Sequence, residues 1–270
     1  MVRYKVCAAE VTTDVCAYCG AKVLKDVSKV KATKEKGEKI EAPKEKPKDA
    51  KPLDILNQID QAKAILVEQS RYSVCKVYAE FRPMFSTGSG FIVSGDYIVT
   101  NAHVVLKENS NRLSLFIEYA DDLKLDTLKK AYAEVLYVSK EDDIAILKPE
   151  RHIPSIIPRL KLCDTLTKQG EAVFTIGNPL HYRFTYIEGS VANPEYNKKN
   201  ASKYSYLQTT LTLNHGNSGG PVFNMRGEVV GMATFSELIK QEDSLEDQVI
   251  RGYGFCVSAK AIHDAISSLK

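Results

Sequence analysis

A glycine-rich segment, HGNSGGPVF, surrounds Ser218 and has the residue types of a turn that carries a nucleophile. Glycines at 216, 219 and 220 let the backbone fold tightly around the serine and let a substrate approach it closely. In such a turn the backbone N–H groups of Gly216 and Ser218 can point at one oxygen, as a developing oxyanion requires. Glycine-rich turns with a serine are also common as plain structure, so this segment alone leaves both interpretations open.

Two other segments carry the groups that a serine nucleophile needs. In TNAHVV, His103 follows the strand run IVT, and in EDDIAILK, Asp143 precedes apolar residues that would draw its carboxylate inside. Taken singly, such a histidine is usually a partly buried structural residue, and acidic residues at strand starts are usually solvated, as we expect for Asp142. Together they matter, because a serine hydroxyl needs a base and the base needs a carboxylate to hold its tautomer.

The chain order His103, Asp143, Ser218 is one of the recurrent orders of a Ser-His-Asp triad. The segments GSGFIVSGDYIVTNAHVV, DDIAILK, FTIGNP and LNHGNSGGPVFN resemble the chymotrypsin-fold serine peptidases, and most closely those of the HtrA/Deg type. The resemblance covers roughly residues 62–258. It implies two six-stranded antiparallel barrels, an active site in the crevice between them, and no cofactor for catalysis.

The resemblance also assigns roles to single residues. It makes Ser218 the nucleophile, His103 the general base, and Asp143, rather than the aspartate before it, the carboxylate that orients the base. The N–H groups of Gly216 and Ser218 become the oxyanion hole. His215 stands where the family commonly has proline, which leaves the resting conformation of the oxyanion loop open.

The specificity pocket follows from the same resemblance. Thr212 stands six residues before Ser218, at the position that would floor the pocket, and without a carboxylate there we do not expect a preference for Lys or Arg. Met232, Ala233 and Thr234 are predicted to form one wall. The expected pocket is therefore shallow and apolar, and it takes small or medium aliphatic side chains.

The rest of the sequence must build the elements that hold these residues. Eleven β-rich runs alternate with turn signals over residues 73–258, which predicts antiparallel barrels or a sandwich rather than a parallel sheet. Apolar residues at three- and four-residue spacing from Leu53 to Leu66 predict a helix of about four turns, and Ala261 to Leu269 predict a closing helix. With the resemblance, the predicted fold class is all-β, a chymotrypsin-like double antiparallel β-barrel with short flanking helices.

Three segments are predicted along the chain. Residues 53–270 form the trypsin-like serine protease domain, after which we expect no PDZ domain. Residues 25–52 hold 10 Lys, six Asp or Glu, three prolines and no aromatic residue, which is typical of a flexible linker. Residues 1–24 are too short to build an apolar core without a staple.

The N-terminal segment resembles a degenerate zinc ribbon. Cys16 and Cys19 form a CxxCG knuckle, Cys7 fits the second ligand of a preceding knuckle, and Tyr4 stands where its first ligand would be. Structural zinc takes four N or S ligands, so the three cysteines would need a fourth ligand from elsewhere. One structural zinc ion, or free thiols in a decayed ribbon, are the two interpretations.

Charge and hydropathy exclude several classes of protein. The lysine excess lies in residues 25–52 rather than on a folded face, so we do not expect nucleic-acid binding. No stretch approaches 18 uninterrupted apolar residues, and the first residues lack the apolar core of a secretory signal. We therefore expect no membrane association and a cytoplasmic location.

These features predict a serine endopeptidase that cleaves unfolded or exposed protein segments through an acyl-enzyme, in protein quality control. Two alternatives stay open. One is a catalytically silent protease fold that binds peptides as a chaperone-like module, and the other is an adaptor directed by the N-terminal ribbon. The expected partners are protein or peptide substrates, with a homo-oligomer and a protein partner for the N-terminal segment as further options.

Overall fold

The computed structural model divides the chain into two units, Met1–Ala50 and Lys51–Lys270. The residues that it describes are 2–3, 10–11, 52–107, 110–123, 125, 127–180, 182–197, 202–240 and 249–269. In the first unit, two short strands pair antiparallel, β1 (Val2–Arg3) with β2 (Glu10–Val11). The predicted zinc ligands Cys7, Cys16 and Cys19 and the predicted linker up to residue 51 lie outside the described residues.

The second unit begins with the predicted N-terminal helix, α1 (Pro52–Arg71). Its first residue is a proline, which the first turn of a helix tolerates because the N–H there has no partner within the helix. Leu66 and Val67 pack against the apolar core, whereas Ile55 and Ile59 are exposed. Among the described residues, no helix has the length and apolar character needed to cross a membrane.

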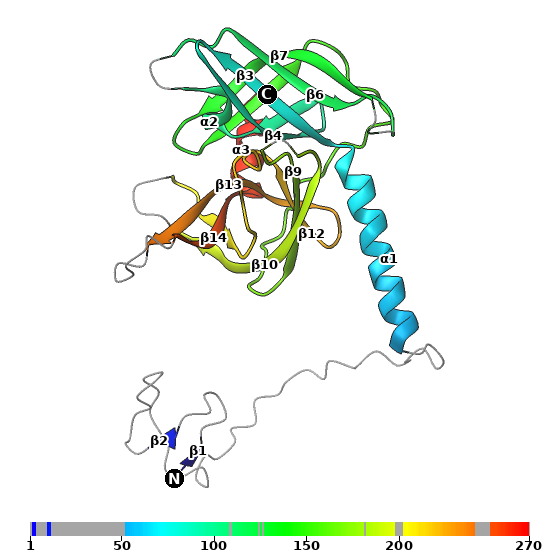
Figure 1. Cartoon of the computed structure of the whole chain (residues 1–270), viewed down its shortest axis with the longest axis vertical. Helices are drawn as coiled ribbons and strands as arrows, with labels where there is room; N and C mark the ends of the chain where they lie inside the picture. The colour runs from blue at the N-terminus through cyan, green and yellow to red at the C-terminus, as the bar shows by residue number, and fades with distance from the viewer. Residues whose placement is uncertain are drawn as a thin grey trace. The chain divides into compact units, whose positions relative to one another are not determined.

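Six strands close into the first barrel (Figure 1). In sheet order they are β3 (Val74–Phe81), β4 (Met84–Val93), β5 (Tyr97–Thr100), β8 (Ile144–Pro149), β7 (Leu128–Ser139) and β6 (Ser114–Ala120). Every neighbouring pair is antiparallel. In β3, Val77, Ala79 and Phe81 are buried while the residues between them are partly exposed, the period-two pattern of a strand with one face on a core.

Six further strands close into the second barrel, also antiparallel. In sheet order they are β10 (Thr185–Tyr196), β11 (Tyr206–Thr209), β14 (Val249–Ser258), β13 (Val229–Lys240), β12 (Pro221–Asn224) and β9 (Ala172–Gly177). Helix α3 (Ala259–Ser267) follows β14 directly, and the side chain of Ser258 caps it by accepting a hydrogen bond from the Ala261 N–H.

One apolar cluster joins both barrels and α3. Phe91 and Ile146 of the first barrel belong to it together with Phe174 and Phe255 of the second barrel and Ile262 of α3, and all five are fully buried. Figure 1 shows α3 between the two barrels. Because close-packed interiors resist a change of shape, this cluster holds the loops at the junction of the barrels in register.

The predicted fold class, an all-β double barrel with two flanking helices, is confirmed. The eleven predicted β-rich runs become twelve barrel strands because the run GSGFIVSGDYIVTNAHVV forms both β4 and β5. Gly95 and Asp96 separate the two strands with positive φ values of 83° and 59°. The end of the same run leaves the sheet as one helical turn, α2 (Ala102–Val105), which carries His103.

Candidate active site

His103 and Asp143 lie side by side where α2 meets the turn between β7 and β8. Asp143 Oδ1 accepts a hydrogen bond from the His103 backbone N–H at 3.0 Å, and Asp143 Oδ2 lies 2.8 Å from His103 Nδ1. The carboxylate thus holds both the backbone and the ring, and it leaves Nε2 for another partner. The imidazole is half exposed and the carboxylate is 18% exposed, so the pair is open on the side of the ring.

An unusual backbone conformation directs the Asp143 carboxylate. Its φ is 53°, in the left-handed region that residues other than glycine rarely adopt. The Asp143 carbonyl accepts a hydrogen bond from Asn101 Nδ2 at 2.9 Å, and the same nitrogen lies 3.2 Å from Thr234 Oγ1. Asn101 is fully buried, so it ties the Asp143 turn of the first barrel to β13 of the second.

Two glycines shape the turn that carries Ser218. Gly216 and Gly219 have φ values of 97° and 87°. A Cβ atom would lie 2.5 Å from the Asn178 carbonyl at position 216 and 2.1 Å from the Ser89 carbonyl at position 219. Both positions therefore require glycine, for conformation and for space.

Ser89 of β4 in the first barrel holds this turn through hydrogen bonds to two of its carbonyl groups. Its backbone N–H donates to the Ser218 carbonyl at 2.8 Å, and its Oγ donates to the Gly216 carbonyl at 2.7 Å. The same Oγ accepts a hydrogen bond from the Asn178 N–H at 2.8 Å. Ser89 is fully buried, so a residue of one barrel fixes the turn of the candidate nucleophile in the other.

The backbone N–H groups at this turn are available for an oxyanion. The His215 carbonyl accepts a hydrogen bond from the Leu180 N–H at 3.0 Å. Because a trans peptide points its C=O and N–H in opposite directions, the Gly216 N–H faces away from Leu180. Within the part of the chain that the structure describes, neither this N–H nor that of Ser218 has a hydrogen-bond acceptor.

The Ser218 hydroxyl itself points elsewhere. It donates to the Thr234 carbonyl at 3.0 Å and, in the described structure, has no hydrogen bond to His103. His103, Ser218 and Thr234 nevertheless line one hollow. Rotation about the Cα–Cβ bond of the serine is the motion that redirects its hydroxyl, and catalytic hydrogen bonds often tighten only when substrate is bound.

The hollow beside Ser218 has a volume of about 440 Å³. It is lined by His103, Leu213, Asn214, His215, Ser218, Thr234, Phe235 and Ser236. Leu213 and Phe235 supply apolar wall, and the remaining lining residues supply hydroxyl, amide and imidazole groups. The hollow is therefore mixed in character rather than purely apolar.

Three of the four predicted specificity residues do not line this hollow. Thr212 is exposed, because its neighbours Leu211 and Leu213 turn inward and extended chain alternates its side chains. Met232 and Ala233 are fully buried, because β13 is covered on both faces, by the cluster that joins the barrels and by the core of the second barrel. Of the four, only Thr234 lines the hollow.

Burial raises the pKa values of one phenol and two thiols in the barrels. Burial, and after it the charges of Asp143 and Asp142, raises the pKa of Tyr206, so its phenol stays protonated at neutral pH. Burial likewise raises the pKa of the Cys256 thiol to about 12, and that of Cys75 is raised as well. Neither thiol is therefore a nucleophile at neutral pH.

Sequence reasoning assigned no role to Ser89, Asn101 or Asn178, although all three belong to the quoted segments. The signal that could have found them is a polar residue inside an apolar run. Such a residue is buried with its neighbours, and a buried polar side chain needs hydrogen-bond partners. The expectation that Asp142 is solvated is wrong. Asp142 is 8% exposed, and its carboxylate accepts hydrogen bonds from two serine hydroxyls.

No group of three or more His, Cys, Asp or Glu side chains that could hold a metal ion occurs among the described residues. The predicted zinc ligands Cys7, Cys16 and Cys19 lie outside these residues, so the zinc hypothesis stays a prediction.

Comparisons with known proteins agree on one family. The model of the trypsin-like peptidase domain matches residues 88–232. The chain is 36% identical over 148 residues to a "Probable periplasmic serine endoprotease DegP-like" of Hahella chejuensis, covering 54% of this chain and 29% of that protein. It is 36% identical over 164 residues to serine protease HTRA1A of Danio rerio, covering 58% of this chain and 32% of that protein. The matched part is therefore about a third of each relative's length.

Solved structures share the fold. The Rv3671c protease from M. tuberculosis in its active form superposes with a TM-score of 0.58 at 23% identity, covering 81% of this chain and 87% of that one. The serine endoprotease from Yersinia pestis superposes with a TM-score of 0.59 at 23% identity, covering 77% of this chain and 66% of that one.

The cytoplasmic location predicted from the sequence is contradicted by these comparisons. Several of the relatives at 35–36% identity are named periplasmic. The prediction depended on the lack of an apolar leader in the first residues, and such a lack does not decide in which compartment a folded barrel works.

Proposed function

The chain belongs to the trypsin-like peptidase domain family and contains a serine protease domain, and we propose that it hydrolyses peptide bonds in unfolded or exposed segments of proteins, in protein quality control. The observation that carries this proposal is the His103–Asp143 pair, at 2.8 Å, whose histidine lines the same hollow as Ser218. Three groups that are 40 and 75 residues apart in sequence converge there.

In the proposed reaction, Ser218 turns its hydroxyl from the Thr234 carbonyl toward His103 Nε2. As Ser218 Oγ bonds to the substrate carbonyl carbon, His103 takes the hydroxyl proton, and Asp143 stabilises the imidazolium. Collapse of the tetrahedral intermediate breaks the C–N bond, and His103 gives the proton to the leaving amine. Water then attacks the acyl-enzyme by the same route and regenerates Ser218.

The N–H groups of Gly216 and Ser218 stabilise the negative oxygen of both tetrahedral intermediates. Their lack of acceptors within the described residues supports this role, because donors already aimed at the developing charge need no reorganisation during the reaction. The hydrogen bond from the Leu180 N–H to the His215 carbonyl supports this role further. It fixes the peptide between His215 and Gly216, so that the Gly216 N–H faces away from Leu180.

A second candidate function is a catalytically silent protease fold that binds peptides. The observation that favours it is the hydrogen bond from Ser218 Oγ to the Thr234 carbonyl, which in this structure takes the hydroxyl away from His103. Both candidates use the same hollow for an extended peptide, so peptide binding alone does not separate them.

Labelling with a fluorophosphonate separates the two candidates, because this reagent modifies only a serine that a base has activated. We expect one adduct per chain, located on Ser218 by peptide mass spectrometry, with none in Ser218→Ala or His103→Ala. Casein cleavage should be lost in the same two variants. A folded wild-type protein that takes up no label and cleaves no casein would favour the silent module.

A further inference from the structure

Asp142, the neighbour of Asp143, has an environment that the proposed mechanism does not use. In the turn between β7 and β8, Glu141 is exposed whereas Asp142 is 8% exposed. The Asp142 carboxylate accepts a hydrogen bond from Ser139 Oγ at 3.0 Å and one from Ser202 Oγ at 2.7 Å. Its backbone N–H donates to Ser139 Oγ at 3.1 Å. A carboxylate is buried in this way only when hydrogen bonds replace its water.

Ser202 reaches Asp142 from the other barrel. It belongs to the connection between β10 and β11, whereas Ser139 ends β7 of the first barrel. The same Ser202 Oγ accepts a hydrogen bond from the Tyr204 N–H at 3.0 Å. We call Asp142, Ser139 and Ser202 the Asp142 clamp, because together they join the turn before Asp143 to the second barrel.

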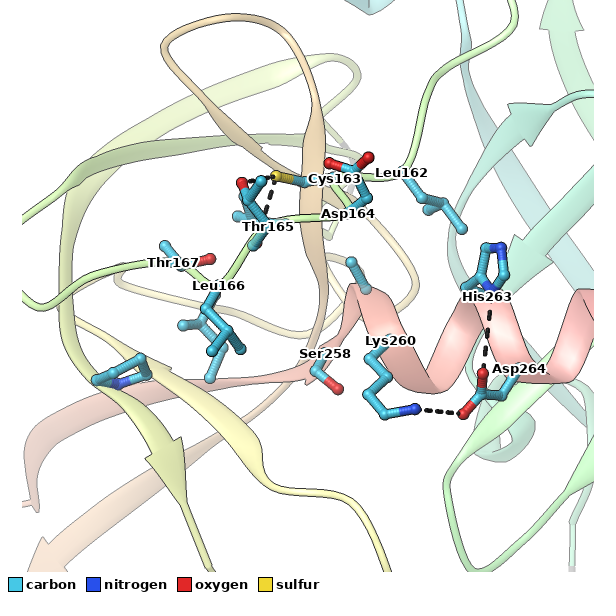
Figure 2. Close-up of a pocket in the computed structure, with 14 residues that line it drawn as sticks. Leu162, Cys163, Asp164, Thr165, Leu166, Thr167, Ser258, Lys260, His263 and Asp264 are labelled. Carbon is cyan, nitrogen blue, oxygen red and sulfur yellow. Dashed lines mark hydrogen bonds and ion pairs between the residues drawn. The ribbon is translucent and has the colours of Figure 1, made fainter.

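The Ser202 side of the clamp is anchored on α3. Tyr204 Oη donates to Asp264 Oδ2 at 3.0 Å, and Lys260 Nζ donates to the same oxygen at 2.9 Å. Figure 2 shows Lys260, Asp264 and His263 together on α3, where they line a pocket with both apolar and polar residues. The 202–204 segment is therefore held by a helix that packs against both barrels.

The Asp142 clamp is one residue away from the group that contacts His103, because Asp142 directly precedes Asp143. Asp143 has a left-handed φ of 53°, which an isolated chain would rarely populate. Asn101 holds the Asp143 carbonyl on one side, and the clamp holds the residue before it on the other. Such a conformation persists only where its surroundings determine it from more than one direction.

We propose that Asp142 is a positioning residue of the peptidase, which acts through Asp143 by holding its left-handed turn so that the carboxylate meets both the backbone N–H and Nδ1 of His103. This inference rests on the proposed function, because its effect is on the catalytic base. By the same inference, residues 202–204, which connect two strands of the second barrel, help to set the geometry of His103 in the first barrel.

The test compares four single variants under steady-state conditions with a short peptide substrate. We expect Asp142→Ala to lower kcat about tenfold and Ser202→Ala to lower it about threefold, with KM changed less than twofold, because misplaced catalytic groups slow the chemical step rather than binding. Ser202→Thr keeps the hydroxyl and should restore kcat to within twofold of the wild type. Glu141→Gln, the exposed carboxylate of the same turn, should leave kcat unchanged.

A double variant and a stability measurement distinguish positioning from a purely structural role. If the two side chains act through one hydrogen bond, Asp142→Ala combined with Ser202→Ala should be no slower than Asp142→Ala alone. Thermal unfolding, together with titration of reactive sites by fluorophosphonate, gives kcat per folded site. Unchanged kcat per site in Asp142→Ala and Ser202→Ala would overturn the proposal, whatever the change in melting temperature. A wild-type chain that takes up no label would overturn the proposed function, and the positioning role with it.

Discussion

At the scale of single residues, the candidate site depends on which way a few polar atoms point. Asp143 directs both carboxylate oxygens at His103, whereas the Ser218 hydroxyl points at the Thr234 carbonyl. The proposed base and its carboxylate are therefore preorganised, whereas the proposed nucleophile must first turn its hydroxyl toward them. Serine has a single heavy side-chain torsion and its staggered positions interconvert readily, so this last step is a small one.

Replacing Asp143 by Asn tests the assignment of the orienting carboxylate. An amide at this position presents an N–H to the ring and favours the wrong imidazole tautomer, so kcat/KM on a short peptide should fall about 10⁴-fold. The loss should exceed that of Asp142→Asn by at least tenfold, since Asp142 touches neither ring nitrogen. Circular dichroism controls for folding. Equal losses in the two variants would mean that the orienting carboxylate has been assigned wrongly.

At the scale of elements, hydrogen bonds and ion pairs of polar side chains in turns also hold the barrels together. The turn between β4 and β5 is an example, because Asp96 adopts a φ of 59° there and accepts a hydrogen bond from Arg159 Nε at 3.0 Å. Asp96 also lies 2.6 Å from His152 Nδ1. Residues 152 and 159 both belong to the connection that leads from the first barrel to the second, so this carboxylate fastens that connection to the first barrel.

The Asp96 contact should make stability depend on pH. Partial burial opposes ionisation, but the hydrogen bond and charge of Arg159 outweigh it and lower the pKa of Asp96. A carboxyl group with a lowered folded-state pKa adds stability above its unfolded value, and this stability is lost as the pH falls through the folded value, below about pH 4. Asp96→Asn should therefore lower the free energy of unfolding by about 1–3 kcal/mol at pH 7 and by less at pH 3.

Denaturant unfolding at the two pH values measures this effect. Asp121→Asn is the control, because Asp121 forms a surface pair with Lys129 at 3.6 Å and such pairs contribute about 0–1 kcal/mol. A gap between wild type and Asp96→Asn that is the same at pH 7 and pH 3 would contradict the lowered pKa.

At the scale of the whole molecule, catalysis and the N-terminal cysteines are predicted to be separable. The barrels and α3 share one buried cluster, and the unit that contains them begins at Lys51. In the zinc hypothesis, three cysteines within 13 residues would bind zinc once a fourth ligand completes the site, but the proposed triad uses no metal. We therefore expect a truncated chain that starts at Lys51 to cleave a short peptide at the rate of the full chain.

Metal analysis of both chains completes this test. The full chain, prepared in reducing buffer with zinc, should carry at most one zinc ion, and the truncated chain should carry none. Chelation should hardly change short-peptide cleavage. A full chain without zinc would end the ribbon hypothesis, whereas loss of short-peptide cleavage on chelation would contradict the separation of the two sites. Loss of activity against a large substrate alone would support the alternative of a ribbon that recruits partners.

Much of this protein could be predicted from the sequence, because the information is local. The period-two runs predicted the strands, the three- and four-residue spacing predicted the flanking helices, and glycines at 216 and 219 predicted a tight turn. The order of His103, Asp143 and Ser218 within family-like segments selected one fold class. The compartment was predicted wrongly, because the lack of an apolar leader in the first residues does not decide where the folded domain works.

Only the tertiary structure decided what lies across the junction of the barrels, because those contacts join residues that are far apart in sequence. Ser89 lies 129 residues before Ser218, and Ser202 lies 60 residues after Asp142. No local pattern shows that Ser89 holds the turn that carries Ser218, or that Ser202 helps to bury Asp142. Nor does a local pattern show that Met232 and Ala233 face cores instead of the hollow. Sequence thus determined which chemical groups are present and which elements carry them, whereas packing of two barrels on one apolar cluster determined which groups meet.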